Sequence, residues 1–172
     1  MKLNKIFFSP TDATKKILDG ITKGIEAKIV KEFNLDEINE DFFHEIKSGI
    51  TLFGVPIDDG KISDDLIKKI DQFSADKQIC IIVITYCKKN YKTQLTELKT
   101  LVMNNGFIPI ATAAFIGNRT FTDLDLSEPH SKPDDADINA CYNFGKKIRA
   151  KLGSDKDIIN SVIEKSIKKS VQ

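Results

Sequence analysis

A hydroxyl-rich turn near the start of the chain has the composition of an anion-binding loop. Ser9 and Thr11 stand between the apolar residues 6–8 and an amphipathic segment that begins at Ala13, and Thr14 is the second residue of that segment. A turn that joins the carboxyl end of a strand to the amino end of a helix points free N–H groups and the positive end of the helix dipole at one spot. The hydroxyls add neutral donors, so we expect a phosphate group to bind here.

The same residues also have a simpler interpretation. A Ser/Thr cluster before a helix often serves only as an N-cap, in which Thr11 or Asp12 accepts hydrogen bonds from the first-turn amides without any ligand. Neither a GxGxxG nor a GxxxxGK[ST] pattern is present, so the common dinucleotide and nucleoside triphosphate loops are poor matches. The turn by itself leaves both an anion site and a plain helix cap open.

The cysteines and histidines show no ligand spacing. Cys80, Cys87 and Cys141 form no CxxC pair, and His44 and His130 stand far apart. We therefore predict no disulfide, no metal site and no catalytic acid–base pair. Cys87, which two lysines follow, could be a reactive thiol, although an ordinary loop thiol is the simpler expectation. Cys80 lies in an apolar run and is expected to be inert core.

The composition fits one globular domain. The chain has 172 residues, of which 41% are hydrophobic and 30% charged, enough to bury a sizeable core. Its 26 Lys and Arg against 25 Asp and Glu leave a net charge of +1, which predicts no nucleic-acid partner. No signal-peptide core and no run of about 20 apolar residues is present. We expect no membrane association and a cytoplasmic location.

The elements that must position these residues alternate between strands and helices. Strands are predicted over residues 3–8, 27–33, 49–55, 78–85 and 107–115, and helices over 13–25, 63–73, 92–105, 133–152 and 154–171. Residues 34–47 are expected to form a loop and a short helix. Lys28, Lys31 and Pro109 place two strands at edges, and the apolar run 78–85 is placed at the centre. This alternation predicts an α/β fold, a doubly wound five-stranded parallel sheet with helices on both faces.

Four spaced segments match the motifs of one family: FFSPTDATKKI, GVPIDDGKI, ITYCKKNYKTQLTELKTLVMNNGF and AAFIGNRTF. They resemble segments of flavodoxin-like domains, in particular those fused to an iron–sulfur ferredoxin module. The resemblance implies the strand order 2-1-3-4-5 and a flavodoxin-like domain over residues 1–152. Residues 153–172 are expected to form an amphipathic C-terminal helix packed on the same domain. The C-x-x-C-x-x-C cluster of the fused relatives is absent from this sequence.

The resemblance implies a flavin site. Three loops at the carboxyl ends of the strands would hold flavin mononucleotide (FMN) and its redox-active ring. The phosphate would lie on Ser9, Thr11, Asp12, Ala13 and Thr14, and the ring between Pro56, Ile57, Asp58, Asp59 and Gly60 and Thr85, Tyr86 and Cys87, with Ala114 and Phe115 nearby. The implied activity is electron transfer with a redox partner protein such as a ferredoxin or a reductase.

Three departures from the family pattern fall on these same loops. Asp12 replaces a glycine, Asp58 replaces a tyrosine that stacks on the ring, and Cys87 and Lys88 replace a Gly-Asn pair. A carboxylate beside a phosphate weakens its binding. The alternative is therefore a cofactor-free binding or regulatory domain that kept the fold. A flavin-dependent reductase is a third hypothesis, which no acid–base pair supports. If FMN binds, Asp58 and Asp59 are expected to lower its reduction potential.

Overall fold

The computed structural model describes residues 1–39, 41–57, 60–87, 91–117 and 133–153. The described elements, in chain order, are β1 (Lys2–Phe7), α1 (Ala13–Ile25), β2 (Lys28–Asn34), the 3-10 helix η1 (Leu35–Glu37), β3 (His44–Ile46), β4 (Ile50–Ile57), α2 (Asp64–Asp71), β5 (Phe73–Ala75), β6 (Gln78–Tyr86), α3 (Lys92–Asn104), β7 (Phe107–Ile116) and α4 (Asp135–Leu152). The predicted helix over 154–171 lies outside the described residues. None of the described helices is both long enough and apolar enough to cross a membrane.

Five parallel strands form the main sheet, in the order β2-β1-β4-β6-β7. Counted among these five strands alone, the order is 2-1-3-4-5, which confirms the predicted fold class. β2 and β7 occupy the edges, as predicted. The prediction that residues 78–85 form the central strand was wrong, because β4 lies in the middle and β6 lies between β4 and β7. An apolar run indicates that a strand is buried on both faces, but it does not tell which of the interior strands of the sheet it forms.

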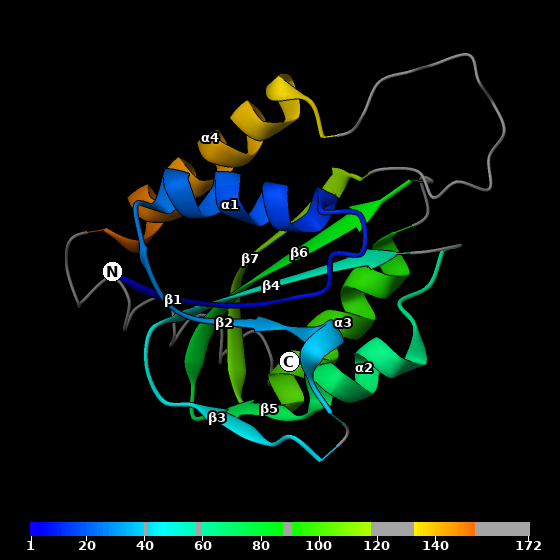
Figure 1. Cartoon of the computed structure of the whole chain (residues 1–172). Helices are drawn as coiled ribbons and strands as arrows, with labels where there is room; N and C mark the ends of the chain where they lie inside the picture. Colours follow the sequence, from blue (N-terminus) through cyan, green and yellow to red (C-terminus); the bar gives the residue numbers. More distant parts are fainter. Residues whose placement is uncertain (40, 58–59, 88–90, 118–132, 154–172) are drawn as a thin grey trace, which may run out of the picture.

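Helices cover both faces of this sheet (Figure 1). α1 and α4 lie on one face, and α2 and α3 lie on the other. Alternate side chains of β6 supply both cores: Ile81 and Val83 pack with residues of α1 and α4, whereas Ile82 and Ile84 pack with residues of α2 and α3. The sheet is thus the middle of three layers, and its carboxyl-terminal edge remains accessible to loops.

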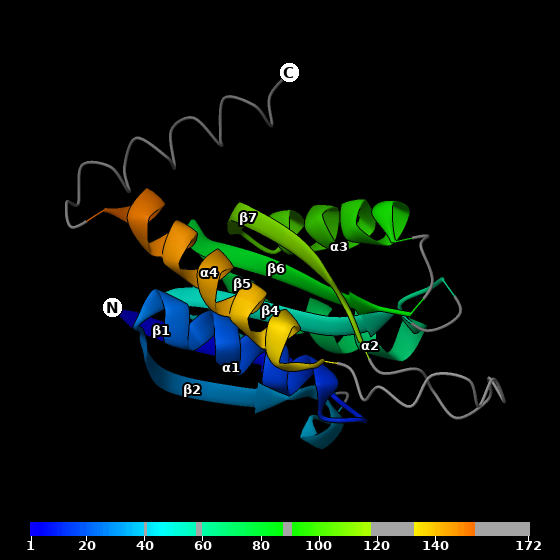
Figure 2. The same ribbon diagram turned by 90° about the horizontal axis from the view of Figure 1, so that it is seen from above.

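Glycines bring α1 and α4 into close contact, and Figure 2 shows the two helices side by side. A Cβ atom added at Gly24 would overlap the backbone carbonyl of Tyr142, and one added at Gly145 would overlap the backbone carbonyl of Ile21. At the end of this contact Arg149 forms an ion pair with Glu26. The two helix backbones therefore touch where no side chain fits between them.

A lysine on β1 joins three elements of the fold. Lys5 is only 1% exposed, and its Nζ lies 2.6 Å from Oδ1 of Asp19 on α1 and 2.9 Å from Oε2 of Glu32 on β2. The same ammonium group lies 5.6 Å from the centroid of the Phe7 ring. A buried charge needs such partners, so these contacts tie the edge strand and the first helix to β1.

The stretch between β2 and β4 differs from the prediction. η1 supplies the expected short helix, but β3 also forms and pairs in parallel with β5 in a separate two-stranded sheet. The helix predicted to reach Phe73 ends at Asp71. Phe73 is fully buried and packs edge-on against Phe33, with Phe42 and His44 beside it. Burial in this aromatic cluster overrides the helical periodicity.

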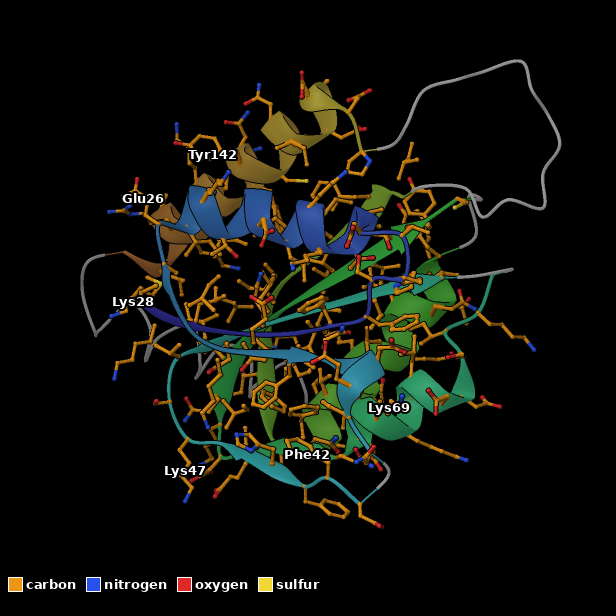
Figure 3. The ribbon with its side chains drawn as sticks, viewed as in Figure 1. Glu26, Lys28, Phe42, Lys47, Lys69 and Tyr142 are labelled. Atoms are coloured by element: carbon orange, nitrogen blue, oxygen red, sulfur yellow. The ribbon has the colours of Figure 1, made fainter. Side chains whose placement is uncertain are left out.

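His44 belongs to the same aromatic cluster. Its ring stacks on Phe42, with centroids 5.6 Å apart and planes 8° apart, and Figure 3 shows Phe42 beside the small β3–β5 sheet. The Nζ atom of Lys31 lies 3.0 Å from Nε2 of His44. Burial and, secondly, the charge of Lys31 lower the pKa of His44 below 6.5. Folding therefore favours the neutral imidazole.

Acidification is expected to destabilise the fold through His44. Because its folded-state pKa is lowered, the unfolded chain takes up this proton first as the pH falls, and stability present above pH 6.5 is lost between that value and the lower folded pKa. Thermal denaturation at about pH 7.5 and about pH 5.5 should show a smaller loss for His44→Gln than for the wild type. Equal losses in His44→Gln and wild type would contradict this role.

Candidate functional site

In the turn between β1 and α1, Ser9 accepts two hydrogen bonds from backbone amides. Its Oγ accepts a hydrogen bond from the amide of Lys15 at 3.0 Å, and its carbonyl accepts one from the amide of Asp12 at 3.3 Å. The expectation that the side chain of Thr11 or Asp12 caps the helix was wrong, because the N-cap residue Asp12 makes no side-chain cap hydrogen bond. Asp12 adopts the left-handed conformation, with φ 59° and ψ −5°. This conformation turns the chain sharply into α1.

The N-terminus of α1 keeps free donors. Within the described part of the chain, the amides of Thr11, Ala13 and Thr14 donate to no acceptor. The hydroxyl of Thr14 lies 2.8 Å from the hydroxyl of Thr85 at the end of β6, and both residues are buried. One hydroxyl of such a pair donates and the hydrogen of the other stays available. The turn therefore offers amide and hydroxyl donors that an anion or a polar chain can accept.

A cavity of about 160 Å³ opens beside this turn. It lies at the carboxyl ends of β1, β4 and β6, where the three predicted loops were expected to meet. The residues that line it are Phe8, Pro10, Thr11, Ala13, Thr14, Pro56, Ile57, Lys61, Ser63, Leu66, Thr85, Tyr86, Cys87 and Gly117. One wall is therefore rich in hydroxyl groups and the others are mainly apolar, a combination that suits a flat aromatic ligand with a polar tail.

The structure brings together part of the predicted site. Eight predicted residues line the cavity: Thr11, Ala13, Thr14, Pro56, Ile57, Thr85, Tyr86 and Cys87. Ser9 and Asp12 shape the first turn without lining the cavity, and Gly60, Ala114 and Phe115 do not line it either. Phe115 packs against Phe144 of α4, with ring centroids 6.1 Å apart. Asp58 and Asp59 lie outside the described residues. Their expected effect on the reduction potential of the flavin therefore stays a prediction.

The prediction missed several residues of the cavity wall, among them Phe8, Leu66 and Gly117. The amide of Gly117 donates to the carbonyl of Tyr86 at 2.9 Å, and a Cβ atom there would lie 3.2 Å from Cβ of Thr85. The glycine thus lets the end of β7 approach the end of β6. Its place in the AAFIG segment was the available signal, two residues beyond the position that the family resemblance indicated.

The aromatic and sulfur groups near the cavity differ in their surroundings. The ring centroids of Tyr86 and Tyr91 lie 4.5 Å apart, with Tyr86 at the cavity and Tyr91 packed against the core.

Cys80 is fully buried, as predicted, and burial raises its thiol pKa. Burial also raises the pKa of Cys141 to about 12. Cys87 is the thiol of the described chain that lines the cavity. No group of three or more potential metal ligands forms among the residues that the structure covers.

Similar proteins were found only at the level of structure. No protein-family model matches the sequence, and no curated protein matches it. A flavodoxin from the domain Archaea matches with a TM-score of 0.54 and 14% identity. The match covers 88% of this chain and 99% of the flavodoxin. A flavodoxin of Streptococcus pneumoniae has a TM-score of 0.60 and 12% identity over 88% and 99% of the two chains. The flavodiiron protein of Giardia intestinalis has a TM-score of 0.57 and 10% identity over 96% of this chain and 37% of that one.

These structural similarities, at 10–14% identity, show the fold alone, so the ligand must be argued from the residues of the site. The chain has a flavodoxin-like fold, which flavodoxins and a part of a flavodiiron protein share. Toward a flavin, the free amides of Ala13 and Thr14 and the apolar wall with Ile57 and Tyr86 are suitable partners. Asp12 is the unfavourable feature, because its carboxylate stands at the amide-rich turn. On balance the residues present fit a flavin.

Proposed function

We propose that this protein binds flavin mononucleotide and carries electrons. The observation on which this depends is the cavity at the carboxyl ends of β1, β4 and β6, which meets the free amides at the N-terminus of α1. An apolar cavity joined to an anion-binding turn suits a ligand that is an aromatic ring at one end and a phosphate at the other. The likeness of the fold to flavodoxins supports the proposal.

The residues of the chain would bind and orient the cofactor, and the flavin supplies the one- and two-electron chemistry when bound. The amides of Thr11, Ala13 and Thr14 would donate to its phosphate. The side chains of Ile57 and Tyr86 at the cavity wall would contact the ring and exclude water from part of it. A second protein, such as a ferredoxin or a reductase, would exchange electrons with the bound flavin.

FMN fluorescence is expected to be quenched when the purified protein is added. Tyr86→Ala removes an aromatic wall of the cavity and should weaken FMN binding by about tenfold, the effect of roughly 1.4 kcal/mol. Tyr142→Ala is the matched control, because Tyr142 lies on α4 with 38% of its surface exposed and does not line the cavity. It should bind FMN like the wild type. An absence of quenching at several hundred micromolar FMN would refute the proposal.

A cofactor-free binding or regulatory domain is the second candidate, and Asp12 favours it. The family pattern has glycine at this position, and here a charged residue occupies a left-handed conformation that suits glycine. This candidate predicts negligible FMN binding by the wild type and a gain of binding in the double variant Asp12→Gly/Asp58→Tyr. Strong binding by the wild type would exclude it.

A further inference from the structure

Asp12 stands in the chain between two residues whose amides are free. It follows Thr11 and directly precedes Ala13, and the amides of both neighbours lack an acceptor within the described residues. The Asp12 side chain is exposed and makes no cap hydrogen bond. Nor does the described part of the chain supply an ion-pair partner for it. Its negative charge therefore remains available to interact with whatever binds at the turn.

The turn holds the backbone of Asp12 in place. The carbonyl of Asp12 accepts the amide of Lys16 at 3.0 Å, and its own amide donates to the carbonyl of Ser9 at 3.3 Å. Two residues further on, the Thr14 hydroxyl is bonded to Thr85 on β6. The left-handed backbone of Asp12 is thus fixed on both sides, and the short side chain keeps the carboxylate next to the turn in every rotamer.

The distance between the carboxylate and a bound group is short. Adjacent Cα atoms lie about 3.8 Å apart, so a group that accepts from the amides of Thr11 or Ala13 stays within the screening length of about 8 Å at physiological salt. A phosphate with up to two negative charges is repelled at this range. A neutral hydroxyl group can accept from the same amides without that repulsion. Lys15 and Lys16, which are exposed as Asp12 is, attract a phosphate and offset part of this repulsion.

We propose that Asp12 sets the charge of the ligand at this turn, so that the site binds riboflavin, which lacks the phosphate, at least as tightly as FMN. This inference rests on the proposed flavin site. It assigns Asp12 as a residue that determines specificity: the amides and hydroxyls of the turn bind the ribityl end, and the carboxylate removes the advantage that a phosphate would otherwise have.

Two variants separate charge from backbone strain. Asp12→Asn keeps the size of the side chain and tolerates the left-handed conformation, but removes the charge. Asp12→Gly removes the charge and relieves the backbone. Asp76→Asn is the control, because Asp76 is exposed in the turn between β5 and β6, next to the N-terminal end of β6, and does not line the cavity.

Dissociation constants for FMN and riboflavin, measured by flavin fluorescence at low and high salt, test the proposal. The wild type and Asp76→Asn should bind riboflavin at least as tightly as FMN. Asp12→Asn and Asp12→Gly should bind FMN about tenfold tighter than wild type, with little change for riboflavin, and the gain should shrink at high salt. A wild type that prefers FMN, with the same preference in Asp12→Asn, would overturn the role of Asp12 while leaving the flavin site intact. Binding of neither flavin by any variant would refute the flavin site itself.

Discussion

Replacing Gly24 with alanine is expected to lower the free energy of unfolding by about 3 kcal/mol, the upper end of the usual cost of overpacking. The added Cβ would overlap the backbone carbonyl of Tyr142 and lie 3.0 Å from Cα of Gly145. Because both neighbours are backbone atoms of α4, no side chain can rotate away and the helix itself must shift. The higher helix propensity of alanine returns at most about 1 kcal/mol.

Gly20→Ala is the matched control for this prediction. Gly20 lies one turn earlier on the same face of α1, and its added Cβ would meet Cβ of Cys141 at 3.0 Å and the carbonyl of Ile138 at 3.4 Å. These contacts are tight but do not overlap the backbone of α4. Gly20→Ala should therefore lower the free energy of unfolding by at least about 1 kcal/mol less than Gly24→Ala does. Urea denaturation followed by circular dichroism measures both. Equal stability of Gly24→Ala and wild type would show that the two helices are farther apart than the structure indicates.

Neutralising both ion-pair partners of Lys5 should also lower the free energy of unfolding strongly. In the double variant Asp19→Asn/Glu32→Gln, the 1% exposed ammonium group keeps hydrogen-bond acceptors but loses both opposite charges. Removing the partners of a buried charge costs about 3–5 kcal/mol. The carboxylates themselves are 43% and 36% exposed, so solvent already weakens the pairs and we expect the lower end, about 3 kcal/mol.

Adding Lys5→Met to this double variant should restore most of the lost stability, because the apolar side chain fills a similar volume and leaves no buried charge. Glu45→Gln removes an exposed ion pair, in which Lys47 is 80% and Glu45 54% exposed. It should change stability by less than about 0.5 kcal/mol. Urea denaturation of the wild type, the double variant, the triple variant and Glu45→Gln measures these changes in stability. A triple variant no more stable than the double variant would show that the ammonium charge was not the cause.

Both predictions depend on contacts that no local pattern in the sequence reveals. Gly20 and Gly24 can be read as small residues on one helix face, but nothing nearby in the sequence says that Gly145 lies opposite. Likewise Lys5 interrupts an apolar strand, and its pairing with Asp19 and Glu32 depends on the neighbours of β1. Such contacts arise only when elements distant in the chain pack together.

The sequence by itself was sufficient for the strands of the main sheet and for their parallel arrangement. Apolar runs separated by amphipathic segments require crossover helices on both faces, and the lysines of β2 and Pro109 of β7 marked the edges. It was also sufficient to locate a turn of Ser9, Thr11 and Thr14 at the end of β1. These features depend on residues close together in the chain, where spacing and propensity act directly.

Only the tertiary structure decided how the turn is built and what stands around it. It assigned the cap to Ser9, bonded Thr14 to Thr85, and placed Gly117 and Leu66 at the cavity wall. It also ended α2 two residues early, because burying Phe73 in the small β3–β5 sheet outweighs two more helical residues. The physical reason is common to all: burial and hydrogen bonding between residues far apart in the chain outweigh local preferences of a few tenths of a kcal/mol to about 1 kcal/mol.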